Sequence, residues 1–307
     1  MTSVDSERDE SGGMNRDAED TAHDLVAAFG PRAVPVSRLG FGGATAGLSN
    51  YLEEYDAAHP ASREAMMAAL RHAVALGVTY FDTAPGYGDG LSEAIFGEAL
   101  QGTQVFLATK VPLSAAGQVR RSLEASLRRL RRDRVDLLQL HGTSYGPDEE
   151  AIVLRSGGML EELHRLKDAG LVDMLGFTSE DNNAAVYRFI ACGGFDAMQI
   201  CYNFMHQHPY DSTRPFGSLI EAKRRGMCTV TMRTATSGVF QRWIQAVNPA
   251  NTFDYTEALI QFVLSNPTVD VALVGMRDIA TIEANVRIWR DVAKRIDIAA
   301  LQARYVT

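Results

Sequence analysis

Eight short apolar runs, separated by segments with helical periodicity, are the feature that most limits how this chain can fold. The helical segments repeat apolar residues every three or four positions, and several of them end at a glycine. Strands that alternate with helices form parallel βα units, which assemble as an open sheet or as a closed eight-stranded barrel. The runs lie at 39–43, 78–81, 105–109, 135–140, 171–177, 197–202, 227–232 and 269–274.

Length and composition indicate one folded domain with an N-terminal extension. The chain has 307 residues, of which 46% are hydrophobic, and a single β/α barrel commonly occupies this length. Residues 1–30 are rich in Asp, Glu, Ser and Gly and show little apolar periodicity before 22–29. We therefore predict a disordered acidic tail over 1–30 and a barrel domain over 31–307.

Charge and cysteine content exclude several classes of protein. The net charge is −8, and the one basic run, 128–134, is interpreted as a solvated helix face, so no nucleic-acid binding is expected. No segment has the apolar length of a membrane span, and the N-terminus lacks the order of a signal peptide, which predicts a cytoplasmic protein. Three cysteines without CxxC spacing predict neither a disulfide framework nor an iron–sulfur or other metal site.

Polar residues close three of the apolar runs. Asp82 follows the second run, Lys110 ends the third and His141 ends the fourth, while Tyr87 lies in a glycine-rich turn just after Asp82. Taken singly, each is typical of a solvated strand end. In a parallel barrel, however, the carboxyl ends of the strands meet at one mouth. We therefore expect the four side chains to converge in an active site there.

Two long segments resemble the signatures of the aldo-keto reductase superfamily. They are FDTAPGYGDGLSEAIFGEAL at 81–100 and LEASLRRLRRDRVDLLQLH at 123–141, and the similarity runs from about Ser37 to about Arg290. The resemblance implies an α/β fold of the (β/α)8 TIM-barrel type, with the active site at the C-terminal face of the strands. No GxGxxG follows the first run, as it would in a dinucleotide-binding open sheet.

The resemblance also implies a catalytic tetrad for carbonyl reduction. Hydride must come from a bound nicotinamide, because no side chain supplies it. Tyr87 would donate the proton, and the ammonium of Lys110 would bring the pKa of the phenol closer to neutrality. Asp82 would hold Lys110 by an ion pair, and His141 would orient the carbonyl oxygen.

Five residues stand at or near the positions of the family's contacts to the nicotinamide half of the cofactor. Gln199 stands where the family reads the carboxamide, which requires both a donor and an acceptor. Thr178 and Ser179 replace the family's serine and asparagine, and the shorter Ser179 reduces the reach to the carboxamide. Met232 stands near the usual stacking tyrosine and would cover the ring with its sulfur. Arg233 would touch the pyrophosphate or form a structural ion pair.

The segment after the last run resembles the family's adenosine-phosphate site. Gly275 permits close backbone approach, and Arg277 offers a fork for a ribose phosphate near a helix N-terminus. Asn285 matches the asparagine that reads adenine, whereas Thr281 replaces an arginine or glutamine of many relatives. The resemblance thus implies NADP (NADPH) as cofactor, with NAD possible.

Four long segments that follow strands, 45–62, 142–158, 203–215 and 234–254, are expected to rim the mouth. Their aromatic and histidine side chains would wall a pocket for a small-molecule carbonyl or sugar, although each could equally pack its loop on the barrel. These residues are Tyr51, Tyr55, Tyr145, Phe204, His206, His208, Tyr210 and Trp243.

The predicted function is an NADP(H)-dependent aldo-keto reductase that transfers hydride between nicotinamide and a carbonyl or alcohol. The segment DTAPGYG at 82–88 is also similar to the branch of sugar and pyridoxal dehydrogenases, so a sugar or alcohol dehydrogenase is an alternative. A cofactor-binding, redox-sensing regulatory subunit, like the potassium-channel β subunits, is a third. The sequence indicates no oligomeric state.

Overall fold

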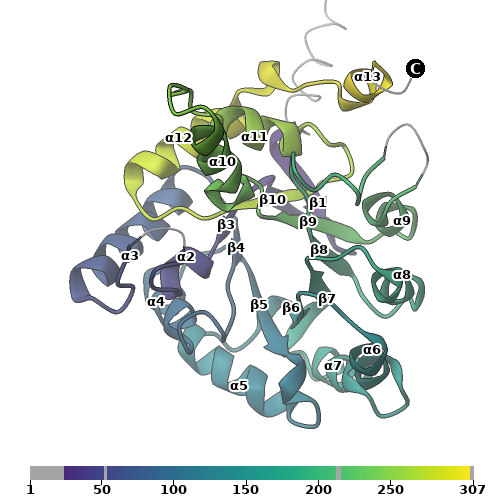
Figure 1. Cartoon of the computed structure of the whole chain (residues 1–307). Helices are drawn as coiled ribbons and strands as arrows, with labels where there is room; N and C mark the ends of the chain where they lie inside the picture. The colour runs from purple at the N-terminus through teal and green to yellow at the C-terminus, as the bar shows by residue number, and fades with distance from the viewer. Residues whose placement is uncertain (1–23, 52–53, 212–215, 305–307) are drawn as a thin grey trace, which may run out of the picture.

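Eight parallel strands close into a barrel in the computed structural model, which describes residues 24–51, 54–211 and 216–304. The strand order around the barrel is β10-β3-β4-β5-β6-β7-β8-β9 (Figure 1). Each strand overlaps one of the eight apolar runs, which confirms the predicted TIM barrel. The strands are β3 (Leu39–Gly42), β4 (Tyr80–Asp82), β5 (Phe106–Pro112), β6 (Val135–His141), β7 (Val172–Ser179), β8 (Ala197–Cys201), β9 (Cys228–Met232) and β10 (Val271–Val274).

Helices surround the strands (Figure 1). Eight of the helices that the structure describes each bury an apolar stripe on the barrel. In α5, for example, Val119, Leu123, Leu127 and Leu130 share the buried face. Within the residues that the structure describes, no helix is long and apolar enough to cross a membrane. The eight are α3 (Pro60–Ala75), α4 (Leu91–Ala99), α5 (Val119–Leu130), α7 (Met159–Asp168), α8 (Ala184–Ala191), α9 (Ser218–Arg224), α11 (Thr256–Leu264) and α12 (Ile279–Arg290).

Short elements interrupt the connecting segments. The segments expected to rim the mouth contain α6 (Pro147–Leu154), η2 (Thr236–Gly238) and α10 (Val239–Val247) and part of α2 (Ala44–Gly47). The expectation of long loops was therefore only partly right. Outside these segments lie η1 (Leu113–Ala115), η3 (Val292–Lys294) and α13 (Ile298–Ala303).

An antiparallel hairpin closes the N-terminal end of the barrel. Its strands, β1 (Val26–Phe29) and β2 (Val34–Ser37), pair directly. Phe29 is fully buried, and its ring lies 5.4 Å from that of Tyr80 and 5.0 Å from that of Phe106 between centroids. The prediction of a disordered tail was therefore wrong for residues 24–30, because Phe29 gains enough burial to order them. Residues 1–23 of the predicted tail lie outside the described residues.

The basic run 128–134 is a solvated face in part, because Arg128, Arg131 and Arg134 are exposed, but two of its other arginines tie α5 to α4. Arg129 Nε donates to Oε2 of the buried Glu93 at 2.7 Å. Arg132 Nη2 donates to the carbonyl oxygen of Leu100 at 2.8 Å. These guanidinium groups satisfy a side-chain acceptor on α4 and a backbone acceptor at its C-cap, Leu100.

The interior of the barrel changes from apolar to polar toward the C-terminal ends of the strands. Side chains two positions apart on a strand point the same way, so Tyr80 leads to Asp82, and Leu137 leads through Gln139 to His141. The apolar layer at the hairpin end includes Tyr80, Phe106, Leu137, Met174, Val230 and Val271. The polar layer above it carries the candidate site.

Candidate active site

The four expected catalytic side chains line one cavity of about 330 Å³ at the C-terminal ends of the strands. Asp82 ends β4, Lys110 lies on β5 and His141 ends β6, while Tyr87 lies in the turn between β4 and α4. Lys110 Nζ is 2.5 Å from Asp82 Oδ1 and 5.0 Å from the centroid of the Tyr87 ring. The rings of Tyr87 and His141 meet edge to face at 5.7 Å between centroids. The structure thus brings all four together.

Close backbone packing holds the turn that carries Tyr87. Helix α2 passes so near that a Cβ on Gly47 would lie 2.2 Å from the carbonyl oxygen of Tyr87. A Cβ on Gly88 would in turn lie 2.2 Å from the carbonyl oxygen of Gly47, and Gly88 also has a φ of +66°. Only glycine fits this double approach, which explains why glycine follows Tyr87.

Burial dominates the electrostatics of Tyr87. Burial raises the pKa of the phenol, and the charge of Lys110 opposes this rise without cancelling it. The predicted effect of Lys110, which lowers the pKa of Tyr87, is confirmed in direction, but burial outweighs it, so the net shift is upward. Tyr87 accordingly remains a protonated donor at neutral pH.

The other three groups have coupled electrostatics. Burial disfavours the charge on Lys110, but Asp82 and Tyr87 outweigh it, so the pKa of the lysine is raised. Burial raises the pKa of Asp82, opposed by Lys110 and by hydrogen bonds from amide side chains. Burial and the neighbouring Lys110 charge lower the pKa of His141 to about 3. His141 is therefore a neutral imidazole at neutral pH.

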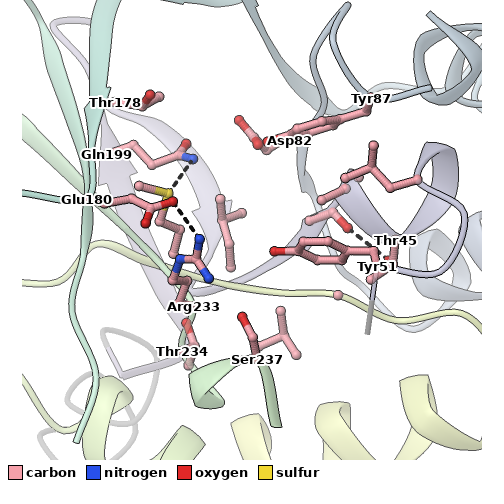
Figure 2. A pocket seen from close by; sticks show the side chains of 18 of the residues that line it. Thr45, Tyr51, Asp82, Tyr87, Thr178, Glu180, Gln199, Arg233, Thr234 and Ser237 are labelled. Carbon is pink, nitrogen blue, oxygen red and sulfur yellow. Dashed lines mark hydrogen bonds and ion pairs between the residues drawn. The ribbon is translucent and has the colours of Figure 1, made fainter. Parts of the chain in front are cut away.

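Amide side chains form the wall beside the tetrad. Gln139 Nε2 donates to Asp82 Oδ2 and to Gln199 Oε1, both at 3.1 Å. Gln199 lines the cavity, and its Nε2 makes a long contact of 3.8 Å with Met232 Sδ (Figure 2). Gln199 and Met232, two of the expected nicotinamide contacts, therefore both line the cavity.

Thr178 and Ser179, the last two residues of β7, differ in whether they line the cavity. Thr178 lines the cavity, but its Oγ1 donates to the carbonyl oxygen of Gly142 at 2.8 Å and accepts from the Gly142 amide. Ser179 is buried away from the cavity lining, and its Oγ donates to the carbonyl oxygen of Asp181 at 2.9 Å. The expected contact of Ser179 with a cofactor has no support in this geometry, because its hydroxyl stabilises the following loop.

Arg233 lines the cavity and forms an ion pair with Glu180, with Nη2 2.6 Å from Oε1 (Figure 2). The Arg233 backbone has a φ of +58°, and its carbonyl oxygen accepts from Asn203 Nδ2 at 3.0 Å. Nearby, Thr234 Oγ1 is buried and has no hydrogen-bond partner among the described residues. This part of the cavity thus offers a guanidinium and an unsatisfied hydroxyl.

The structure places some of the expected adenosine-phosphate residues in the cavity wall and others outside it. Gly275 lines the cavity, where an added Cβ would lie 2.6 Å from Thr45 Cγ2. Arg277 lies outside the lining, with its guanidinium 4.1 Å from the centroid of the Tyr55 ring and Nε donating to the Thr45 carbonyl oxygen.

Helix α12 carries the remaining two, Thr281 and the buried Asn285. Its N-cap, Asp278, accepts from both the backbone amide and the hydroxyl of Thr281, at 2.8 and 2.7 Å. A negative charge therefore stands where the resemblance places a phosphate.

Among the eight rim side chains expected to wall a pocket, Tyr51 lines the cavity, and its ring is directed into it opposite Arg233 (Figure 2). Tyr145 is buried against Phe189 and donates to the Thr178 carbonyl oxygen, so it packs its loop.

No described cluster of His, Cys, Asp or Glu could hold a metal ion.

Sequence reasoning missed several polar residues in or beside this cavity, among them Glu180 and Gln139. Gln139 lies two positions before His141 on the same strand, so period-2 alternation already predicts that it faces inward. Glu180 follows β7 in an irregular segment, where no periodicity indicates the direction of a side chain.

The chain was compared with models of protein families and with proteins of known function. The model of the aldo/keto reductase family matches residues 38–259. L-galactose dehydrogenase of Arabidopsis thaliana is 26% identical over 292 residues, covering 85% of this chain and 86% of that protein. Methylglyoxal reductase YeaE of Escherichia coli is 46% identical over 94 residues, covering 29% of this chain and 33% of that protein.

Solved structures share the fold. An aldo-keto reductase from Klebsiella pneumoniae in complex with NADPH superposes with a TM-score of 0.68 at 24% identity, covering 91% of this chain and 94% of that chain. The glycerol dehydrogenase of Gluconobacter oxydans has a TM-score of 0.65 at 18% identity, covering 91% of this chain and 94% of that chain.

Proposed function

The chain belongs to the aldo/keto reductase family, whose model matches most of its length, and it is an oxidoreductase. From this premise we propose that it transfers hydride between NADPH and the carbonyl of a small molecule. The observation that carries the proposal is the convergence of Tyr87, His141 and the Lys110–Asp82 pair in one cavity that Gln199 also lines.

The polar groups of the cavity fit a nicotinamide dinucleotide. Gln199 presents an amide whose contact to Met232 is long, at 3.8 Å, and which is therefore available to a carboxamide. Arg233 and the unpartnered hydroxyl of Thr234 offer a cation and a donor for a pyrophosphate. Gly275 brings backbone to the cavity without a side chain. When bound, the cofactor supplies the hydride.

The tetrad supplies the proton and the electrostatics. Tyr87 donates its hydroxyl proton to the carbonyl oxygen as negative charge develops there. The ammonium of Lys110 then stabilises the negative charge left on the Tyr87 oxygen, and Asp82 keeps that ammonium in place and charged. His141 is neutral, so it orients the carbonyl by hydrogen bonding and adds no positive charge.

We propose NADPH as the preferred cofactor, with NADH as a usable second one. The resemblance to NADPH-bound relatives and the fork of Arg277 support the phosphate, whereas the carboxylate of Asp278 opposes it. A sugar or alcohol dehydrogenase is the second candidate, because similarity to L-galactose dehydrogenase extends over 85% of the chain.

Steady turnover tests the proposal. The purified protein is mixed with NADPH or NADH and a panel of small aldehydes and aldoses, and with NADP or NAD and the matching alcohols and sugars, while reduced cofactor is followed by absorbance. We expect multiple turnovers of at least one carbonyl with NADPH. Turnover confined to sugar oxidation would favour the dehydrogenase candidate. Binding of cofactor without turnover of any substrate would contradict both and favour a redox-sensing regulatory subunit.

A further inference from the structure

Gln139 lies inside the barrel, one layer above the apolar cluster that contains Leu137 and Tyr80, and it is in register with Lys110 on the neighbouring strand. It is fully buried, with an exposed fraction of 0%, and it lies on β6 between Leu137 in the apolar layer and His141 in the cavity wall. Gly176 on the neighbouring strand gives it room, since a Cβ there would lie 3.1 Å from Gln139 Cγ. Gln139 does not line the cavity, so it can act on a ligand only through its neighbours.

The Gln139 amide hydrogen-bonds both to Asp82, the partner of Lys110, and to Gln199, which lines the cavity. Its Nε2 donates at 3.1 Å to Asp82 Oδ2, the carboxylate oxygen that Lys110 does not hold, and at 3.1 Å to Gln199 Oε1. Both hydrogens of the amide nitrogen are therefore used. One side chain thus connects the Asp82–Lys110 pair to the amide that faces the nicotinamide position.

The polarity of this chain of hydrogen bonds follows from Asp82. A carboxylate accepts hydrogen bonds and donates none, so it requires the NH2 end of Gln139. The second N–H of Gln139 then requires the oxygen end of Gln199. This fixes the Gln199 amide with its NH2 toward Met232 and the cavity. Asp82 therefore determines, through Gln139, that the cavity wall presents a donor.

The cost of this arrangement argues against a purely structural role for Gln139. Its Oε1 is buried with no hydrogen-bond partner among the described residues, and such an orphan acceptor destabilises a fold. An apolar side chain like Leu137 would avoid that orphan acceptor, but it would leave Asp82 Oδ2 and Gln199 Oε1 without the donor that they now share. An amide at this position supplies the two N–H donors that Asp82 and Gln199 accept.

We propose that Gln139 is a positioning residue that orients the Gln199 amide so that its NH2 group meets the carboxamide oxygen of nicotinamide. The proposal rests on the proposed function, because it assumes a nicotinamide cofactor. It predicts that loss of Gln139 weakens contacts at the nicotinamide end of the cofactor and leaves the adenosine end unchanged.

Binding of two probes tests this. NADPH and 2′-phospho-ADP-ribose, which lacks nicotinamide, are titrated by calorimetry against the wild type, Gln139→Met and Gln139→Asn. Methionine keeps the volume and removes both donors, and asparagine keeps the amide but is too short to reach both partners. We expect the Kd for NADPH to rise about tenfold in both variants, and the Kd for 2′-phospho-ADP-ribose to stay unchanged.

A double-mutant cycle supplies the control. In a Gln199→Leu background, which lacks the amide to be oriented, Gln139→Met should cause no further loss of NADPH affinity. Unchanged NADPH binding in the Gln139 variants, or equal weakening of both probes, would overturn the positioning role while leaving the proposed function intact. Failure of the wild type to bind NADPH would instead contradict the proposed function itself. Should Gln139→Met fail to fold, the milder Gln139→Asn decides the question.

Discussion

Arg233 and Glu180 form an ion pair on the wall of the cavity, with Nη2 2.6 Å from Oε1. Each side chain is about one-third exposed. The pair joins the end of β9 to the segment after β7, two parts of the chain that sequence periodicity does not connect. Because a pyrophosphate would compete with Glu180 for the same guanidinium, the pair sets how strongly Arg233 attracts a dinucleotide.

The variant Glu180→Gln is expected to bind NADPH and NADH about three- to tenfold more tightly, because the competing negative charge is gone while the size of the side chain remains. Arg233→Met should weaken both by a similar factor. Fluorescence titration of both cofactors checks this. Weaker binding in Glu180→Gln would show that the carboxylate itself holds the ligand.

Cofactor choice is expected to respond to the opposite charges of Arg277 and Asp278. Arg277→Ala should reduce NADPH affinity by roughly 1.5–3 kcal/mol, the range for hydrogen bonds to charged groups, and leave NADH almost unchanged. Asp278→Asn should tighten NADPH selectively, because asparagine caps a helix as well as aspartate but carries no charge.

The same titrations decide between the two roles of Arg277. An equal response of NADPH and NADH to Arg277→Ala would indicate that its packing on Tyr55 and Thr45 is its whole contribution.

The hairpin at the base of the barrel is expected to contribute substantially to stability. Phe29→Ala removes a fully buried ring that packs on Tyr80 and Phe106, and such changes cost about 3–5 kcal/mol. Urea unfolding followed by circular dichroism measures the loss. Phe253→Ala is the matched control, because that ring is 61% exposed, and it should change the free energy of unfolding by less than about 0.5 kcal/mol. Similar losses in the two variants would contradict the packing role of Phe29.

The strands and three of the tetrad residues can be predicted from the sequence, because each of these residues closes an apolar run. An apolar run that ends in Asp82, Lys110 or His141 fixes both the strand and the edge at which the polar group lies. Tyr87 follows from the glycine-rich turn just after Asp82, but the packing that holds this turn does not, because it joins Gly47 and Gly88, which are far apart in the sequence.

The remaining features depend on tertiary contacts that local patterns do not encode. The four residues of β1 are too few to show alternation, and Phe29 is ordered by aromatic neighbours from β4 and β5. The net pKa direction of Tyr87 reflects burial, which the sequence does not reveal. The side chain of Ser179 turns toward its own loop because Asp181 offers hydrogen-bond partners there.

The low pKa of His141, about 3 against an ordinary value of 6.5, predicts that stability falls on acidification. Between pH 3 and 6.5 the unfolded chain binds a proton that the folded protein excludes, so the stability contribution of this group is complete above pH 6.5 and lost as the pH drops. The slope is at most about 1.4 kcal/mol per pH unit. Urea unfolding between pH 4 and 7 should show a shallower slope for His141→Gln than for wild type. Parallel slopes would mean that His141 titrates normally in the folded protein.

Proton donation by Tyr87 is the central claim, and single-turnover kinetics of Tyr87→Phe test it most directly. The substitution removes only the hydroxyl, so the Kd for NADPH should stay within about twofold of the wild-type value. The rate of hydride transfer to a carbonyl that the wild type reduces should fall about 10²- to 10⁴-fold. His141→Gln, which keeps the proton source and alters only the orientation of the carbonyl, should fall less. A hydride-transfer rate in Tyr87→Phe close to that of the wild type, with cofactor binding intact, would contradict the account.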